Sequence, residues 1–254
     1  MATELERLAA EAATCTRCRL HETRTQVVFG EGSPSAELMF VGEAPGYHED
    51  KQGRPFVGPS GQLLDRLLAG IGLRREDAYI CNVLKSRPPR NRDPQPDEIA
   101  ACRYWLDAQV RLVDPKVVVT LGNFAAKTLL ETTTGITRLR GRSYPFQGRV
   151  LLPTFHPAAA LHASGRVGPS PLDGMEEDFR LLAKLLAERG AAPPKQPASD
   201  STATPEGAEA SEAAPASEGA KGPEGAPASE AARSSEDETG APGEAPDSEQ
   251  LGLF

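Results

Sequence analysis

Short runs of consecutive apolar residues alternate along the first 190 residues with stretches in which apolar positions recur every three or four residues. This alternation predicts strands joined by helices, and therefore an α/β fold with a parallel sheet and helices on both of its faces. The strand runs are apolar at successive positions, as is typical of strands covered on both faces. The predicted strands are residues 37–42, 78–83, 116–122 and 149–153. The predicted helices are residues 3–13, 60–70, 96–112, 123–131 and 173–189.

Three residues mark expected helix starts. Ser60 and Asp173 are predicted N-caps, since their side chains can accept hydrogen bonds from the first turn. Pro96 is followed by two acidic residues, a pattern that favours the first turn of a helix.

The hydrophobic pattern stops near residue 190. Residues 191–249 contain no Val, Ile, Leu or aromatic residue, and such a segment cannot bury enough apolar surface to offset its ordering entropy. We expect a folded domain over 1–190 and a disordered acidic linker of Ala, Pro, Gly, Ser and Glu over 191–249. The last five residues, 250–254, are QLGLF, so three large apolar side chains end a polar tail.

Charge is distributed as unevenly as hydrophobicity. From Ala191 onward, 13 Asp and Glu residues stand against 3 Lys and Arg, whereas residues 1–190 hold 23 acidic and 25 basic residues. The folded part is nearly neutral, which leaves nucleic acid open as a partner. No apolar run approaches the ~20 residues that a membrane span needs, and the acidic, amphipathic N-terminus is no secretory signal. We therefore expect a cytoplasmic protein with no membrane attachment.

Unusual residues follow three of the predicted strands, at positions 42–46, 82–93 and 154–157. In parallel sheets, ligands bind where loops leave the carboxyl ends of the strands. Glu43 stands at the exit of the first strand, where its carboxylate can face such a cleft. The alternative interpretation is a helix-capping turn with surface acids.

Three further side chains are candidates for the same cleft. Phe56 lies alone in a Gly- and Pro-rich loop, where it can stack on a planar base or anchor the loop on the core. Asn82 ends a strand and can offer one donor and one acceptor to a ligand, or cap a turn. His156 follows the last strand and faces the same edge, although a lone histidine is often structural.

Basic residues concentrate in two loops. Residues 85–92 contain four of them, and residues 135–142 contain three. Together they predict a phosphate-binding rim, with an ordinary solvated face as the alternative. The rim residues are Lys85, Arg87, Arg90, Arg92, Arg138, Arg140 and Arg142.

Four cysteines in a cytoplasmic protein favour metal or redox chemistry over structural disulfides. Cys15 and Cys18 form a Cys-x-x-Cys pair that follows a predicted helix without a preceding strand, which argues against a thioredoxin-like pair. With Cys81 and Cys102 they would complete a four-thiolate site for zinc or an iron–sulfur cluster. Inside a strand, however, a thiol such as Cys81 is more typical of a core residue.

Four motifs together resemble family 4 uracil-DNA glycosylases, the iron–sulfur members of the uracil-DNA glycosylase superfamily. These motifs are GEAPG followed by ED, GRPFVG, an Asn-ended strand before K-x-RPP-x-NRDP, and a late HPA. The resemblance covers residues 10–190 and implies a three-layer α/β/α fold around a four-stranded parallel sheet. It also implies hydrolysis of the N-glycosidic bond of deoxyuridine in DNA, the first step of base excision repair.

The resemblance assigns a role to each matching residue. Glu43 resembles the acid at the water site, Phe56 the ring that stacks on uracil, and Asn82 the residue that reads the uracil edge. His156 resembles the histidine at uracil O2, and Glu43 and His156 are the catalytic candidates. The predicted uracil-binding residues are Glu43, Ala44, Glu49, Phe56, Asn82 and His156. The turn at 47–49 is the candidate wall that excludes the thymine methyl group.

The resemblance also implies a structural 4Fe–4S cluster, with one departure. Cys15, Cys18 and Cys102 match three of the family's ligands, but the fourth position is Ser86. Either Ser86 supplies an oxygen ligand, or Cys81 replaces it after a local shift, or a cluster of three thiolates keeps an open site. Of these, we favour three cysteines with an undetermined fourth ligand.

Other functions stay open at this stage. The fold could serve another base specificity, such as hypoxanthine or mismatched thymine, or a non-catalytic DNA-binding module. The C-terminal residues Gln250, Leu251, Leu253 and Phe254 resemble the short motif with which bacterial repair proteins bind the sliding clamp. We expect a monomer whose main partner is uracil-containing DNA.

Overall fold

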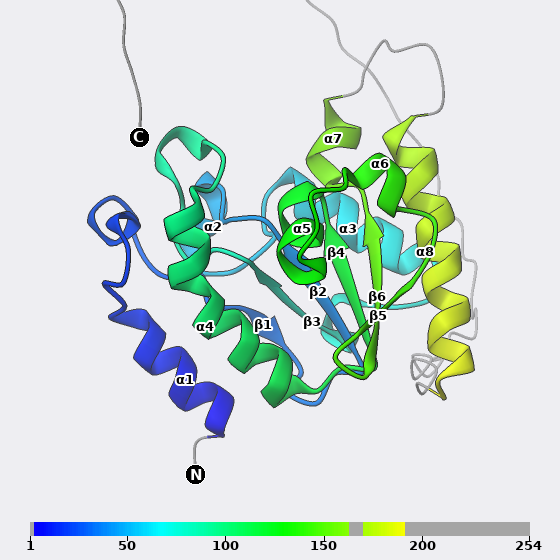
Figure 1. Ribbon diagram of the computed structural model, residues 1–254, viewed down its shortest axis with the longest axis horizontal. Coiled ribbons are helices and arrows are strands. Elements are labelled where there is room, and N and C mark those ends of the chain that lie inside the picture. The colour runs from blue at the N-terminus through cyan, green and yellow to red at the C-terminus, as the bar shows by residue number, and fades with distance from the viewer. Residues whose placement is uncertain (1–2, 163–169, 191–254) are drawn as a thin grey trace, which may run out of the picture. The chain divides into compact units, whose positions relative to one another are not determined.

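The computed structural model describes residues 3–162 and 170–190 (Figure 1). A six-stranded sheet runs through this part in the order β1-β3-β2-β4-β6-β5. Its strands are β1 (Glu31–Gly32), β2 (Leu38–Gly42), β3 (Ala78–Asn82), β4 (Val117–Leu121), β5 (Tyr144–Phe146) and β6 (Arg149–Thr154). The four inner strands β3, β2, β4 and β6 are parallel, whereas β1 and β5 pair antiparallel at the two edges.

The prediction of a four-stranded parallel sheet was therefore wrong in strand number and in strand direction at the edges. The four predicted strands are the inner four. β1 and β5 are only two and three residues long, too short to carry a periodic apolar pattern. They form because neighbouring strands β3 and β6 offer them unpaired backbone groups.

Helices cover both faces of the sheet, which gives three layers (Figure 1). On one face, Met39 and Val41 of β2 share a core with α4 (Pro96–Val113) and α5 (Asn123–Leu130). On the other face, Leu38 and Phe40 share a core with α3 (Pro59–Gly70) and α8 (Pro171–Glu188). Successive strand residues point to opposite faces, so each inner strand is mostly apolar.

The remaining helical elements are short or peripheral. α1 (Glu4–Ala13) packs on α4. The others are α2 (Tyr47–Gln52), α6 (Ile136–Leu139) and α7 (Pro157–Leu161), with 3-10 turns at Arg19–Glu22, Arg75–Asp77 and Pro89–Asn91. Within the described ranges, none of the helices is both long enough and apolar enough to cross a membrane.

Two of the predicted helix caps are wrong by one or more positions. α3 begins at Pro59 after an N-cap at Gly58, so Ser60 lies inside its first turn. α8 begins after Ser170, and Asp173 closes the reciprocal capping box as its third residue. Pro96 is the first residue of α4, as predicted. The predicted linker 191–249 and the motif 250–254 lie outside the described residues.

The register of the sheet brings the strand ends level with one another. Gly42 of β2 pairs with Asn82 of β3, and Leu121 of β4 pairs with Thr154 of β6. The loops that leave these strands therefore start from one edge of the sheet.

Candidate active site

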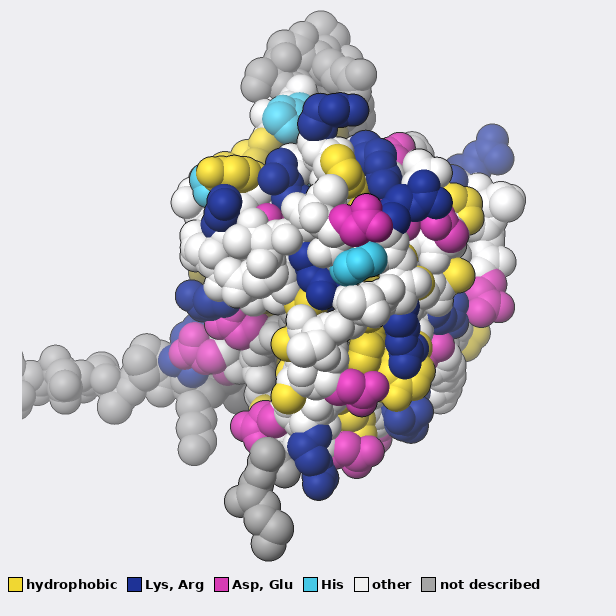
Figure 2. Space-filling model, turned by 90° about the vertical axis from the view of Figure 1, so that its left-hand side faces the viewer, with side chains coloured by type: hydrophobic (Ala, Val, Ile, Leu, Met, Phe, Trp, Pro, Cys, Tyr) yellow, Lys and Arg dark blue, Asp and Glu magenta, His cyan; other side chains and the backbone are white. Residues whose placement is uncertain are grey.

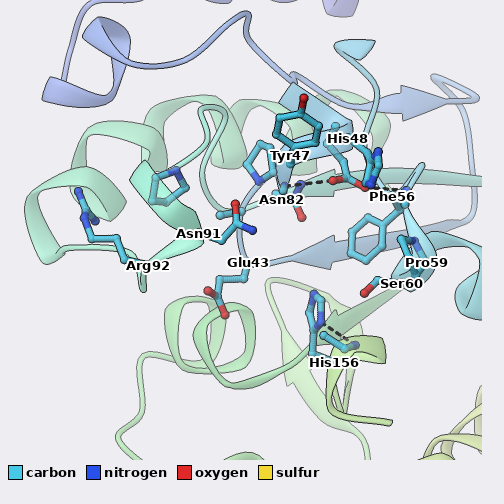
Figure 3. A pocket seen from close by; sticks show the side chains of 17 residues that line it. Glu43, Tyr47, His48, Phe56, Pro59, Ser60, Asn82, Asn91, Arg92 and His156 are labelled. Atoms are coloured by element: carbon cyan, nitrogen blue, oxygen red, sulfur yellow. Dashed lines mark hydrogen bonds between the residues drawn. The ribbon is translucent and has the colours of Figure 1, made fainter. Parts of the chain in front are cut away.

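A cavity of about 470 Å³ opens at this edge of the sheet (Figure 3). Glu43 enters it directly after β2, Asn82 from the end of β3, and His156 two residues after the end of β6. The predicted uracil-binding residues Glu43, Ala44, Glu49, Phe56, Asn82 and His156 all line this cavity. Its volume is in the range of small-molecule sites.

Asn82 and Phe56 can approach each other because residue 42 has no side chain. A Cβ atom at Gly42 would lie 2.4 Å from Oδ1 of Asn82 and 2.5 Å from a ring carbon of Phe56. Asn82 is 2% exposed, and its Oδ1 has no hydrogen-bond partner among the described residues. A buried acceptor without a partner costs about 1–3 kcal/mol, so this oxygen is suited to a ligand that donates a hydrogen bond.

The Phe56 ring is held by its backbone rather than by a helix or strand. Phe56 has φ 51°, a left-handed conformation that is uncommon for a non-glycine residue. The guanidinium of Arg75 donates to the carbonyl oxygens of Pro55 and Phe56. A Cβ atom at Gly61 would lie 1.7 Å from the Phe56 carbonyl oxygen, so α3 begins directly against this loop. These contacts fix the ring 5.9 Å from that of His156, between centroids.

His156 is held as a neutral hydrogen-bond donor. It is the N-cap of α7, and its Nδ1 accepts a hydrogen bond of 3.1 Å from the backbone N–H of Ala158. In a neutral ring, the proton must then sit on Nε2. Burial lowers the pKa of His156 to about 4, against a small opposing effect of Glu49. At neutral pH the ring therefore offers an uncharged Nε2–H.

The pKa of Glu43 is shifted in the opposite direction to that of His156. Burial, and secondly the negative charge of Asp93, raise the pKa of Glu43 to about 7. A carboxyl group with such a pKa can take up and release a proton near neutral pH, which is the property of a general base or acid.

Glu49 lines the cavity, but its carboxylate is already engaged. It accepts hydrogen bonds from the backbone N–H groups of Gly46, Val57 and Gly58, at 3.1, 3.0 and 2.9 Å. These bonds join the start of α2 to the loop that carries Phe56. Glu49 therefore positions two walls of the cavity, a role that the sequence does not indicate because its partners are backbone groups.

The comparison with known sequences agrees with this geometry. Residues 29–180 match the sequence profile of the uracil DNA glycosylase superfamily. The chain belongs to the uracil-DNA glycosylase superfamily. It is 45% identical over 190 residues to a type-4 uracil-DNA glycosylase of Sulfurisphaera tokodaii, covering 71% of this chain and 84% of that one. A type-4 uracil-DNA glycosylase of Thermotoga maritima is 47% identical over 159 residues, covering 62% and 83%. Similarity to a type-5 uracil-DNA glycosylase of Thermus thermophilus is lower, 32% over 162 residues, covering 54% and 72%.

The cavity of this superfamily member includes residues that sequence reasoning did not single out as ligand contacts. Ser60, Pro88 and Asn91 line it. Asn91 has φ 55°, and asparagine is enriched in that conformation. Its place in the K-x-RPP-x-NRDP motif is the local signal that could have found it.

The predicted phosphate-binding rim needs two corrections. Lys85 is 2% exposed, and its Nζ donates to the backbone carbonyl of Asn82 from inside the protein. Arg140 pairs with the buried carboxylate of Asp178 at 3.0 Å and with Glu177 at 3.1 Å, so it joins the loop before β5 to α8. Arg140 is directed inward by carboxylates of a distant segment, α8, whereas Lys85 is directed inward by a backbone carbonyl only three residues before it.

The other rim residues remain near the surface. Arg90, Arg138 and Arg142 are exposed, and Arg87 is partly exposed. Arg92 lines the cavity while it pairs with the buried carboxylate of Glu98 at 2.6 Å. Figure 2 views the protein from the side of α1 and α4 and shows basic side chains interspersed with acidic ones rather than in one continuous patch.

The cysteines divide into a group of three and a separate one. Burial raises the pKa of Cys102, and the nearby thiols of Cys18 and Cys15 raise it further. The backbone N–H of Lys85 donates to Sγ of Cys102 at 3.5 Å. Cys81, by contrast, is fully buried within β3, in the core beneath α4.

Ser86 lies beside the group of three. It is 3% exposed, and its Oγ accepts a hydrogen bond of 3.2 Å from Arg24. The same guanidinium donates to the carbonyl oxygen of Cys15 at 2.7 Å. Over the described ranges, no group of three or more His, Cys, Asp and Glu side chains is arranged so that it could hold a metal ion.

Proposed function

We propose that this protein is a uracil-DNA glycosylase that extrudes uracil from DNA, hydrolyses its N-glycosidic bond and so starts base excision repair. The observation that carries the proposal is the unpartnered, buried Oδ1 of Asn82 beside Phe56 in the cavity. An enzyme cannot reach a base inside a duplex, so the nucleotide must enter such a cavity after extrusion. Such a substrate places the enzyme in the cell compartment that holds DNA, and in a bacterium this is the cytoplasm.

The residue types of the cavity match the edge of uracil. Asn82 would accept from N3–H and donate to O4, while the ring of Phe56 stacks on the base. Cytosine presents an acceptor at N3 and a donor at N4, so the same amide orientation would reject it. The turn at residues 47–49 would exclude the methyl group of thymine by shape.

The proposed hydrolysis proceeds by departure of the uracil ring. As the C1′–N1 bond breaks, its electron pair goes to N1, and the negative charge spreads to O2 and O4. The Nε2–H of His156 would stabilise the charge at O2 without itself being charged. The departing uracil anion takes up a proton from solvent.

Glu43 would serve the sugar side of the same reaction. Its carboxylate would orient the water whose oxygen forms the new bond to C1′, and it would stabilise the positive charge on the sugar. One proton of that water passes to Glu43 and then to solvent. Only the ionised form can do this, so the raised pKa of Glu43 predicts a rate that increases as the pH rises through about 7.

A cleavage panel tests the proposed activity against the alternatives. Purified protein is incubated with oligonucleotides that carry uracil opposite guanine, opposite adenine or in a single strand, and with hypoxanthine and T·G substrates. We expect free uracil and an abasic site from the uracil substrates without added metal ions. Release of hypoxanthine or thymine alone would indicate the other base specificity, and DNA binding without release of any base would indicate the non-catalytic module.

Asn82→Asp tests how uracil is recognised. A carboxylate cannot donate to O4, so we expect the preference for uracil over cytosine to fall roughly tenfold or more, because a lost hydrogen bond to a buried group costs about 1–3 kcal/mol. The measurement is the ratio of kcat/KM values for the two bases. An unchanged ratio would show that Asn82 does not read this edge.

We further propose that Cys15, Cys18 and Cys102 hold a 4Fe–4S cluster. The donor set fits: the backbone N–H of Lys85 donates to Sγ of Cys102, and the guanidinium of Arg24 donates both to Oγ of the adjoining Ser86 and to the carbonyl oxygen of Cys15. A cluster distributes its thiolate ligands over several irons, so the sulfur atoms need not meet at a single point. When bound, it would supply cross-linking rather than chemistry, joining the segment after α1 to α4.

The fourth ligand in this proposal is Ser86. Arg24 connects it to the Cys15 loop, whereas Cys81 is held within a strand of the central sheet. Protein prepared without oxygen is expected to be brown, with about four irons per chain. Ser86→Cys should resist oxidative loss of iron, since thiolate binds iron better than a hydroxyl group does. Colourless protein with one zinc per chain would contradict the cluster.

For the C-terminal residues we propose a role in recruitment. Gln250, Leu251, Leu253 and Phe254 would bind the sliding clamp, with the apolar side chains in a pocket and Gln250 at its rim. If the ~60 residues before them behave as a flexible chain, their root-mean-square reach is roughly 40 Å. Such a tether would raise the enzyme's local concentration at replicated DNA.

A peptide titration tests the recruitment role separately from catalysis. A fluorescent peptide that ends in QLGLF is titrated with the clamp of the same organism, beside a peptide with Leu253→Ala and Phe254→Ala. We expect binding of the first peptide only. Equal binding of both peptides, or binding of neither, would remove this role and leave the glycosylase proposal unchanged.

A further inference from the structure

Tyr47 is an exposed aromatic side chain at the mouth of the cavity. Among the described residues, the exposed large hydrophobic side chains are Tyr47, Tyr104, Leu161 and Leu172, and of these only Tyr47 lines the cavity. Its ring is 52% exposed, although it begins α2 directly above the site (Figure 3). Such a ring at a binding site offers a free apolar surface to a ligand.

The Tyr47 ring is held in place by charged and aromatic neighbours. The guanidinium of Arg87 lies over it, 5.2 Å from the ring centroid, and the His48 ring meets it edge-on at 5.5 Å. Nε of Arg87 also donates to Oδ1 of Asn91, which lines the cavity, at 2.6 Å. The ring and the cation are thus fixed to the rim before a ligand binds. This reduces the conformational entropy that the two side chains lose on binding.

We propose that Tyr47 and Arg87 form a subsite for the base next to the extruded uracil on the same strand. This inference rests on the proposed function. Extrusion of a nucleotide removes one stacking partner from each neighbouring base, and an exposed aromatic ring at the cavity mouth can replace it. Base–aromatic stacking contributes about 1–3 kcal/mol per base and tolerates any sequence. The charge of Arg87 over the ring suits a phosphate that flanks such a base.

The same ring has a second conceivable role as the wall against the methyl group of thymine. The two roles predict different effects on DNA affinity and on thymine release when the ring is removed. A subsite for the neighbouring base contributes to DNA affinity even when the cavity is empty. A wall contributes nothing to affinity for DNA without a base, and its removal would admit thymine.

The experiment uses the full-length protein and DNA with an abasic-site analogue, next to which 2-aminopurine replaces the neighbouring base. No base enters the cavity in this DNA, so binding is measured independently of catalysis. We expect quenched 2-aminopurine fluorescence in the wild-type complex. Tyr47→Ala should lose most of the quenching and about tenfold in affinity. Tyr47→Phe, which keeps the ring, should retain both.

Tyr104→Ala is the matched control. Tyr104 is 48% exposed and lies under the guanidinium of Arg17 at 4.1 Å, but it does not line the cavity. We expect its affinity and quenching to equal those of the wild type, with folding checked by thermal melting for each variant.

Two results would overturn the subsite. One is Tyr47→Ala with unchanged affinity and quenching, and the other is a gain of thymine release as its only effect. Failure of the proposed function would look different, since the wild type would then bind abasic DNA but release no uracil. Tight binding of abasic DNA that depends on Tyr47 would still support the subsite in that case.

Discussion

The segment between β3 and α4 contributes to both the cavity and the cysteine group, but the two are built in different ways. In the cavity, the chain itself fixes each key side chain: Gly42 admits Asn82 and Phe56, and the Ala158 N–H sets the ring of His156. In the cysteine group, the main side-chain contact comes from a residue that is not a proposed ligand: Arg24 donates a hydrogen bond to Oγ of Ser86. The side chains of the cavity are held in position before a ligand binds. The cysteine group would gain a fixed geometry only when the proposed cluster binds. Changes in the cavity should therefore affect chemistry before stability, and changes among the cysteines should affect stability first.

The largest effect is expected for His156→Asn. Asparagine is a good N-cap and can still accept from Ala158 N–H, but it cannot supply the Nε2–H donor. We expect kcat to fall roughly 10²–10³-fold, as for removal of one oxyanion donor, with little change in Tm. Single-turnover rates and thermal melts measure the two quantities. A full rate would remove His156 from the chemistry, and a large loss of Tm would show that the ring of His156 also stabilises the fold.

Cys102→Ala tests the other side of the comparison. We expect iron content to fall from about four per chain to less than one, together with a marked decrease in Tm, because the cluster joins α4 to the N-terminal segment. Cys81→Ala is the matched control and should keep its iron, since this thiol lies in the core of the sheet. The reverse result, with iron lost from Cys81→Ala and retained in Ser86→Ala, would make Cys81 the fourth ligand.

The electrostatics of the cavity predict a moderate change in pH dependence. Asp93→Asn removes a negative charge that raises the pKa of Glu43, so the ascending limb of the rate should shift from about pH 7 toward lower pH. Profiles of kcat/KM against pH for the two proteins measure the shift. A shift toward higher pH, or none, would contradict the role given to Asp93.

The same raised pKa has a consequence for stability. The folded protein holds the Glu43 proton up to about pH 7, whereas the unfolded chain releases it near 4.5, so the stability linked to this proton is lost as the pH rises through 7. Glu43→Gln should therefore raise Tm at pH 8 and leave it nearly unchanged at pH 5. An equal change in Tm at both pH values would show that the effect of Glu43→Gln does not come from ionisation of the Glu43 carboxyl group.

The smallest effects concern the basic residues. Arg90→Ala should weaken DNA binding about equally for all sequences and reduce the slope of log K against log salt by about 1, if Arg90 contacts one phosphate. Lys85→Met should leave this slope unchanged, since Lys85 is buried beneath Asn82. Binding titrations at several salt concentrations distinguish the two. A reduced slope for Lys85→Met would show that its ammonium group reaches DNA.

The sequence by itself determined the features that depend on local pattern and on strand direction. The four inner strands follow from consecutive apolar residues, and the meeting of Glu43, Asn82 and His156 follows because parallel strands end at one edge of a sheet. The motifs of the cavity were recognisable because loops at that edge use glycine, proline and polar residues for geometry that few other residues allow.

Only the tertiary structure decided the features that depend on a distant partner. β1 and β5 exist because β3 and β6 have open edges, and Arg140 turns inward because it pairs with the buried carboxylate of Asp178 in α8. Glu49 acts on the cavity through the backbone of a loop eight and nine residues away. Such pairings are set by which segments the fold brings together, and the free energy of each contact depends on that arrangement rather than on the residue alone.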